Sequence, residues 1–361
     1  MSRWVVIRES TRERWGGDLR RRRIFERLAN HTDAAVSESW KSADLRSAVG
    51  LGHSRIPLLD RIGPRLRSRP LLAASEQLGS GLLDAAKRWT RPTAVAIYDD
   101  AEAQSIALGV PLPPDRLEQV RERRRGNREA FEWHVVPTRS FAVLVGLDES
   151  RIIVGGNGTD VTRIRPMPWP SRPAVGFVSG AAPGRGIEDL VAAVRLAREV
   201  VPDLRLLLWL VATGTSSEEY LRDLRVSLDR EPYVELGSVP YDELGTQLGR
   251  ATTLAIAHPP NDYMDVALPV KLFDSLAAGR PLIVTPRTET AALVRRHDVG
   301  VVTAGDSIDD LARAIADMVG DDARARALGA QARTVAEREF DWSIVGGRIA
   351  DAILERVGET R

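Results

Sequence analysis

The sequence predicts an α/β protein made of two domains, each containing a parallel sheet. In the second half of the chain, short apolar segments alternate with amphipathic ones, which is typical of strands and helices in parallel sheets. A segment with four prolines, 165–173, precedes that half and cannot form helix or inner strand. With 361 residues the chain is long enough for two such domains. We therefore predict a first domain at 1–165, a semi-rigid hinge at 165–173 and a second domain at 166–341.

The first domain begins with a predicted strand, Trp4 to Arg8, and a glycine pair, Gly16 and Gly17, ahead of a basic helix. Two glycines between a strand and a helix allow the backbone to approach a ligand closely. The next expected elements are a strand at 34–36, helices near 43–49 and 78–89, and a stretch without a clear pattern at 50–76.

An acidic pair follows the next predicted strand, Thr93 to Tyr98. Carboxylates at the carboxyl edge of such a strand face the ligand crevice of a doubly wound sheet. We predict Asp100 as a catalytic-site residue that orients a substrate. Two other interpretations stay open: Asp99 and Asp100 form an acidic metal-binding motif, or they cap the helix that follows.

The first domain is predicted to end with a long charged helix and a compact group of short elements. The helix covers 113–133, and the group comprises strands at 134–136 and 151–154, a helix at 140–146 and a turn at Asn157–Gly158. Asparagine and glycine tolerate the positive φ of a turn. We interpret His134 as a strand-edge histidine rather than a catalytic base.

The second domain is predicted to contain six strands and six helices in alternation, followed by two further helices. The strands are 174–178, 204–210, 233–236, 253–257, 282–285 and 299–302. The helices are 187–200, 217–229, 241–248, 269–278, 288–296 and 308–318, and the last two are 321–341 and 342–357. We interpret His258, which follows the fourth strand, as a histidine satisfied within its loop.

Composition limits location and partners. The 43% hydrophobic and 28% charged fractions describe a globular protein, and the absence of cysteine excludes disulfides and thiolate metal sites. No apolar run is long enough for a signal peptide or a membrane span, so we expect a cytoplasmic protein.

The net charge of +1 divides into +8 for 1–165 and −7 for the rest. This asymmetry favours an anionic acceptor or peripheral contact with an anionic membrane surface, although solvated arginine-rich helix faces explain it equally well. We expect no nucleic-acid partner.

The helix Pro269 to Ala278 is the most informative stretch of the chain. Proline suits its first turn, and Gly279 suits the left-handed position after its end. Lys271 and Asp274 are three residues apart and are expected to share one face near the helix start, where free backbone N–H groups favour phosphate. A cation for phosphate and a carboxylate for sugar hydroxyls indicate a nucleotide-sugar site. A surface ion pair between the two is the simpler alternative. The chain has only three lysines against 48 arginines, which suggests a preference for a compact charge at 271.

The stretch PVKLFDSLAAGRPLIVT resembles the donor-site signature of GT-B glycosyltransferases, particularly glycosyltransferase family 4. The resemblance covers 134–356 well and 1–133 loosely. It implies two Rossmann-like domains facing a cleft, with 342–361 crossing back to the first domain. Two departures stand out: Asp274 occupies the place of the usual glutamate that binds the donor ribose, and Val266 occupies the place of a second glutamate. In the loop after the first strand of the second domain, an expected arginine is replaced by Gly180 or Ala181.

The resemblance also implies a set of donor-binding residues and a reaction. The set is Gly16, Gly17, Gly180, Arg185, Gly186, Val239, Leu268, Val270, Lys271 and Asp274. The reaction is transfer of a sugar from a nucleoside-diphosphate sugar to an acceptor hydroxyl, with retention of configuration. The resemblance also implies that no metal is obligatory. No cofactor is expected, because the nucleotide sugar is a co-substrate.

Three alternatives stay open at the level of sequence. A nucleotide-sugar epimerase of GT-B fold shares the donor site but needs acid and base carboxylates. An enzyme similar to the GT-A glycosyltransferases would use Asp99 and Asp100 to hold a metal ion. A non-catalytic protein that binds sugar nucleotides fits the missing arginine and the replaced glutamates.

Overall fold

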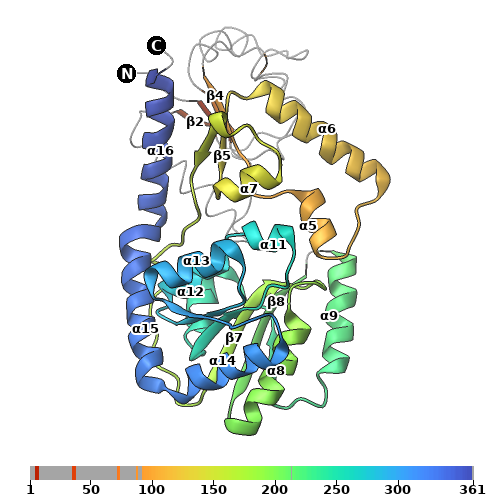
Figure 1. The fold of residues 1–361 in the computed structure, drawn as a ribbon, viewed down its shortest axis with the longest axis vertical. Coiled ribbons are helices and arrows are strands. Elements are labelled where there is room, and N and C mark those ends of the chain that lie inside the picture. The colour runs from red at the N-terminus through yellow and green to blue at the C-terminus, as the bar shows by residue number, and fades with distance from the viewer. Residues whose placement is uncertain are drawn as a thin grey trace. The chain divides into compact units, whose positions relative to one another are not determined.

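The computed structural model describes residues 5–7, 35–37, 71–73, 87, 92–212 and 214–359. Its described strands form two six-stranded sheets in which every pair of neighbours is parallel (Figure 1). The α/β class with parallel sheets is therefore confirmed. Among the described residues, no helix is both long and apolar enough to cross a membrane. Gly16 and Gly17 lie outside the described residues.

The first sheet has the strand order β2-β1-β3-β4-β5-β6. Its strands are β1 (Val5–Ile7), β2 (Ala35–Ser37), β3 (Leu71–Ala73), β4 (Thr93–Ala96), β5 (Trp133–Val136) and β6 (Ile152–Val154). Strand β3 lies in the stretch that showed no clear sequence pattern. The described helices are α5 (Ala101–Ala107), α6 (Pro114–Ala130), α7 (Arg139–Leu144), the 3-10 turn η1 (Glu149–Arg151) and α16 (Trp342–Glu359).

The second sheet has the strand order β12-β11-β10-β7-β8-β9. Its strands are β7 (Ala174–Gly180), β8 (Arg205–Val211), β9 (Val234–Gly237), β10 (Thr253–Ile256), β11 (Leu282–Val284) and β12 (Gly300–Val302). The chain runs outward from β7 to β9 and then returns to pair β10 with the other side of β7. The order therefore reverses between β7 and β10, and ligands bind at such a switch point in open α/β sheets.

The helices of the second sheet follow the predicted alternation. They are α8 (Ile187–Val200), α9 (Thr215–Ser227), η2 (Tyr241–Glu243) with α10 (Leu244–Leu248), α11 (Asp262–Val266), α12 (Val270–Ala277), α13 (Thr288–His297), α14 (Ile308–Gly320), α15 (Asp322–Val335) and the π-helical turn η3 (Ala336–Phe340). The main core joins β7 and β8 to α8 and α14 (Figure 1). The short helix α11 was not predicted; the Asn261 side chain caps it by accepting from the backbone N–H of Met264.

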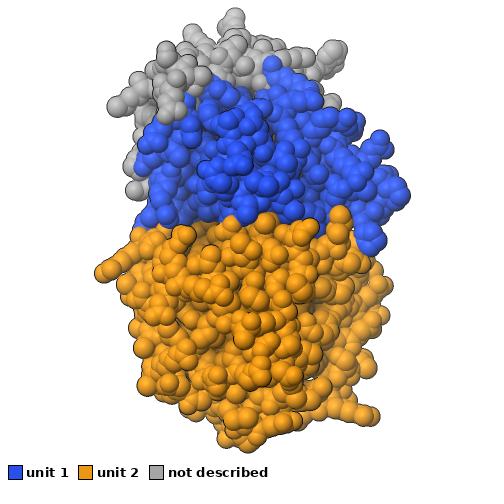
Figure 2. Space-filling model, in the orientation of Figure 1, with its two compact units in different colours: residues 1–104, 111–156, 342–361 blue, residues 105–110, 157–341 orange. Residues whose placement is uncertain are grey.

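The chain divides into two compact units, coloured separately in Figure 2. Unit 1 contains residues 1–104, 111–156 and 342–361, and unit 2 contains 105–110 and 157–341. The sequence placed its boundary at 165, whereas the chain enters unit 2 at Asn157. The cause lies in the segment 157–160, whose polar groups bond within unit 2: the Asn157 amide donates to the backbone carbonyl of Leu268 at 2.6 Å.

The proline-rich segment is bound to unit 2 rather than acting as a free hinge. The buried guanidinium of Arg280 donates to the backbone carbonyls of Met167, Pro168 and Gly249 at 2.7–3.1 Å. The same guanidinium lies 4.7 Å from the ring centre of Trp169, a cation–π contact. Each proline lacks a backbone N–H, so the segment cannot form a regular backbone ladder, and a side chain pairs with its carbonyls instead. The sequence identified Arg280 only as part of the stop after a helix.

Candidate functional site

The candidate site lies where β7 and β10 separate, at the carboxyl edge of the second sheet. Gly186 comes directly before α8 and has a left-handed backbone with φ +77°. A Cβ atom at this position would lie 1.6 Å from the carbonyl oxygen of Ala257, just after β10. The start of α8 therefore packs directly on the loop after β10, and only glycine permits that contact.

The start of α8 and the residues before it form the next part of the site. No side chain caps its free backbone N–H groups, and the preceding Arg185 has a buried Nε atom without a hydrogen-bond partner in the part of the chain that the structure describes. Of the two acidic residues in the first turn, Glu188 is exposed and accepts a 2.6 Å hydrogen bond from the hydroxyl of Tyr220. An uncapped helix start beside a cation favours an anion.

Lys271 brings a second cation to the site from α12. Its Nζ atom is buried, has no hydrogen-bond partner among the described residues, and lies 4.6 Å from the ring centre of Phe177 on β7. Burial, reinforced by the positive charge of Arg185, lowers the pKa of Lys271 to about 7. The site thus holds an ammonium group that lacks the anion it would need for full ionisation.

His258, two residues after β10, lies beside these cations. Its side chain is buried, and neither ring nitrogen has a partner in the described part of the chain. Burial and the charges of Lys271, Arg185 and Arg287 hold its pKa well below the usual 6.5. The interpretation of His258 as a satisfied loop histidine is therefore wrong, because only its backbone carbonyl is bonded, by the hydroxyl of Thr285 at 2.7 Å.

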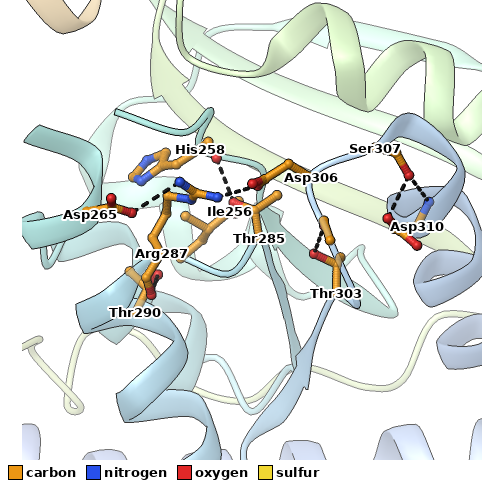
Figure 3. Close-up of polar contacts among 11 residues, drawn as sticks. Ile256, His258, Asp265, Thr285, Arg287, Thr290, Thr303, Asp306, Ser307 and Asp310 are labelled. Carbon is orange, nitrogen blue, oxygen red and sulfur yellow. Dashed lines mark hydrogen bonds and ion pairs between the residues drawn. The ribbon is translucent and has the colours of Figure 1, made fainter. Parts of the chain in front are cut away.

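Arg287 is buried next to His258 but is neutralised by two carboxylates (Figure 3). One is Asp265 on α11, 3.1 Å from Nη1, and the other is Asp306, which follows β12 and contacts Nη2. Their side chains are each about two-fifths exposed, at 38% and 39%. Arg287 thus ties together the loops after three neighbouring strands. Among the described residues, the positive charge of the site without an anionic partner rests on Arg185 and Lys271.

Asp274 points away from Lys271, so the simple ion pair is not formed. Its carboxylate is buried and accepts a 2.8 Å hydrogen bond from the hydroxyl of Thr159. Burial raises the pKa of Asp274 to about 7, and the nearby charge of Asp160 adds to the rise, while the hydroxyls of Thr159 and Tyr241 oppose it. A carboxyl group with this pKa is partly protonated at neutral pH.

The raised pKa of Asp274 predicts a pH-dependent loss of stability. Because the folded-state pKa exceeds the ordinary value of 3.8, the folded state binds more protons between about pH 4 and pH 7, and this contribution to the free energy of unfolding falls as pH rises through that window. In the wild type, titration of Asp274 should lower the free energy of unfolding by about 2–3 kcal/mol between about pH 5 and pH 8. We expect this decrease to be absent in Asp274→Asn. Urea unfolding at both pH values measures the difference.

A matched control exists at Asp242, whose side chain is 73% exposed. The Asp242→Asn variant should lose stability with pH in parallel with the wild type. Parallel curves for Asp274→Asn as well would contradict the raised pKa.

The other predicted donor-site residues lie at a strand end, at a helix start and in loops after strands of the second sheet. Gly180 ends β7 and is exposed, with open space around it. Val239 follows β9, and Leu268 and Val270 flank Pro269 at the start of α12. Their contacts with a donor stay predictions.

Asp100 lies in unit 1 and is fully engaged there. Its Oδ1 atom accepts from the backbone N–H of Ala103 at 2.8 Å, and Arg124 contacts both carboxylate oxygens at 2.7–2.8 Å. The helix-cap interpretation is therefore confirmed, because these contacts begin α5. A role for Asp100 in orienting the acceptor stays a prediction. Among the residues described, no cluster of three or more histidine, aspartate or glutamate side chains has the arrangement of a metal site.

Residues 172–321 match the family model described as glycosyl transferases group 1. A protein of Mycobacterium tuberculosis (strain ATCC 25618 / H37Rv), named GDP-mannose-dependent alpha-(1-6)-phosphatidylinositol monomannoside mannosyltransferase, is 28% identical over 208 residues. These residues are 54% of this chain and 53% of the relative. The chain thus spans about half the length of the curated relatives it matches.

Solved structures share the fold over the whole chain. Sucrose-phosphate synthase from Thermosynechococcus elongatus has a TM-score of 0.74 at 14% identity, with full coverage of both chains. Anabaena HepE, solved in complex with UDP and glucose, has a TM-score of 0.71 at 16% identity and covers 98% of this chain and 100% of its own. At such identities the likeness concerns the fold. Residues 172–321 are therefore similar to the glycosyl transferases of group 1, and the two parallel sheets of the chain have the GT-B fold.

Proposed function

We propose that this protein transfers a sugar from a nucleoside-diphosphate sugar to an acceptor hydroxyl. One observation carries the proposal: two cations that have no anionic partner among the described residues, Arg185 and Lys271, lie with the uncapped start of α8 at the switch point of the second sheet. A diphosphate supplies the missing charge and several acceptor oxygens.

The same groups serve the reaction. Transfer of the sugar leaves an additional negative charge on the nucleoside diphosphate. Preorganised cations and helix N–H groups in a buried site stabilise charge that develops in the transition state, and they do so more strongly than the same groups in water. Arg185, Lys271 and α8 therefore both bind the donor and favour departure of its diphosphate.

Asp274 enters the proposal as the group that binds the donor ribose, as the family resemblance implies. Its carboxyl group lies on the same helix as Lys271 and is held by Thr159. A ribose hydroxyl would have to compete with, or add to, that hydrogen bond. Retention of configuration and independence from metal ions rest on the resemblance and belong to the proposal.

The relatives suggest donors and acceptors to test. One is named GDP-mannose-dependent with a phosphatidylinositol mannoside acceptor, and another was solved with UDP and glucose. We propose a hydroxyl of a glycan, of a lipid-linked molecule or of a natural product as the acceptor. The net charge of +8 in residues 1–165 supports an anionic acceptor or peripheral contact with an anionic membrane surface.

Binding and turnover test the proposal separately. A panel of UDP-, GDP-, ADP- and dTDP-sugars is added to the full chain, with and without a chelator, and unfolding is followed. A donor at 100 times its dissociation constant should add about 2.7 kcal/mol to the free energy of unfolding. Release of nucleoside diphosphate with a glycan or lipid acceptor then shows transfer. Donor binding without turnover would favour a non-catalytic protein, an interconverted sugar would favour an epimerase, and loss of activity with the chelator would remove metal independence.

A further inference from the structure

His258 is the buried polar side chain of the site to which the proposed transfer gives no role. It is 2% exposed, and both ring nitrogens lack partners among the described residues. Leaving a buried donor or acceptor unpaired costs about 1–3 kcal/mol. Buried polar groups in native proteins are otherwise nearly always paired, so such an exception calls for an explanation.

The charged groups around His258 supply no acceptor for its ring N–H. The charged groups that act on the ring are Lys271 on α12, Arg185 before α8 and Arg287 before α13, all of them positive. Lysine and arginine side chains are donors only, so they supply no acceptor for an imidazole N–H. Arg287 in turn engages the carboxylates of Asp265 and Asp306 (Figure 3).

The unpaired atoms around His258 indicate which kind of ligand could form hydrogen bonds with them. The unpaired buried atoms are Nζ of Lys271, Nε of Arg185 and Nε of Arg287, together with the two ring nitrogens. Lysine, arginine and the imidazole N–H all need acceptors, and the second ring nitrogen can accept from a neighbouring cation. Phosphate oxygens are acceptors with negative charge, so one diphosphate supplies what several of these donors lack.

We propose that His258 is a phosphate-binding residue of the donor site, whose ring donates one N–H to a phosphoryl oxygen shared with Lys271 and Arg185. This inference rests on the proposed function and adds a third side chain to the diphosphate site. The backbone supports the role, because the hydroxyl of Thr285 holds the carbonyl of His258 at 2.7 Å and so fixes the loop after β10. The buried position also limits rotation of the ring.

Three variants of His258 separate hydrogen bonding from packing. His258→Phe keeps a flat ring but removes the N–H, whereas His258→Asn and His258→Gln place an amide N–H near the positions of Nδ1 and Nε2. Calorimetry measures the affinity of the full-length wild type and variants for UDP, GDP, their nucleosides and inorganic pyrophosphate. We expect His258→Phe to weaken diphosphate and pyrophosphate binding about tenfold, or about 1.4 kcal/mol, with nucleoside binding unchanged. Asn or Gln should restore most of the affinity.

The outcomes distinguish this inference from the proposed function. Wild-type affinity for diphosphates in His258→Phe, or an equal loss for nucleoside and diphosphate, would overturn the role of His258. A wild type that binds pyrophosphate but no nucleoside diphosphate would overturn the donor proposal alone, and His258→Phe against pyrophosphate would still decide the role of the histidine. A wild type that binds neither overturns both. Melting without ligand checks folding, and the apolar phenylalanine should leave stability equal or higher.

Discussion

Lys271→Met is expected to remove donor binding while making the free protein more stable at about pH 6. The two effects have one cause, the buried ammonium without an anionic partner. A hydrogen bond to a charged group contributes about 1.5–3 kcal/mol, so loss of the ammonium should weaken nucleotide-sugar binding about 10- to 100-fold. Methionine keeps an unbranched stem that can pack on the Phe177 ring.

The gain in stability follows from proton linkage. The folded-state pKa of Lys271, about 7, lies below its ordinary value of 10.5. The unfolded state therefore binds more protons between these values, and the wild type gains stability from this group as pH rises through the window. Below about pH 7 the full penalty for the buried charge is present. We expect Lys271→Met to raise the free energy of unfolding by about 2–4 kcal/mol at pH 6 and by much less near pH 10.

Denaturant unfolding at both pH values and calorimetry with the donor measure the two effects. Lys87→Met is the matched control: the Lys87 side chain is 53% exposed and pairs only loosely, at 3.9 Å, with Glu129. It should leave both quantities unchanged. If Lys271→Met binds the donor as tightly as the wild type, Lys271 is not part of the donor site. If the variant is less stable than the wild type at every pH, Lys271 is not an unpaired buried charge.

Gly186→Ala should destabilise the chain by more than about 3 kcal/mol or prevent folding of unit 2. Alanine is strained at φ +77°, and its Cβ would lie 1.6 Å from the carbonyl oxygen of Ala257. Neither atom is the end of a flexible side chain, so α8 must move off the loop after β10. That movement exposes apolar surface of the second sheet and separates Arg185 from His258.

Gly180→Ala provides the comparison within the same loop. Gly180 lacks a left-handed backbone, and a Cβ there meets open space, so the variant should unfold within about 0.5 kcal/mol of the wild type. Chemical denaturation of both variants measures the contrast. Similar stability of Gly186→Ala and Gly180→Ala would show that α8 does not pack tightly on β10.

Local pattern was sufficient to predict much of unit 2. Helix α8 has the predicted bounds, because apolar residues recur at helical spacing after a glycine and two acidic residues occupy its first turn. Strands β7 to β12 lie within a few residues of their predicted positions, since buried parallel strands form continuous apolar runs. Strand β3 has only three residues, Leu71 to Ala73, and so short a segment carries no period.

The site depended on contacts that sequence spacing does not encode. Helical spacing placed Lys271 and Asp274 on one face, yet one side chain turns to Phe177 and the other to Thr159. Arg287 finds its carboxylates at 265 and 306, after two different strands. His258 was misjudged because a lone histidine in a loop has no sequence signal for its partners. Its position after β10, the strand at the switch point, was the signal available.

Thr159 helps to make unit 2 a segment that could be exchanged as one piece. Its backbone N–H donates to the carbonyl of Phe340 at 2.9 Å, and it forms a parallel bridge with Asp341, so the two ends of segment 157–341 meet. A segment with adjoining ends can be inserted or exchanged as one piece without stretching the chain on either side. Because the hydroxyl of Thr159 also holds Asp274, an exchange at this seam carries the helix of Lys271 with it, and donor preference would travel with the inserted piece.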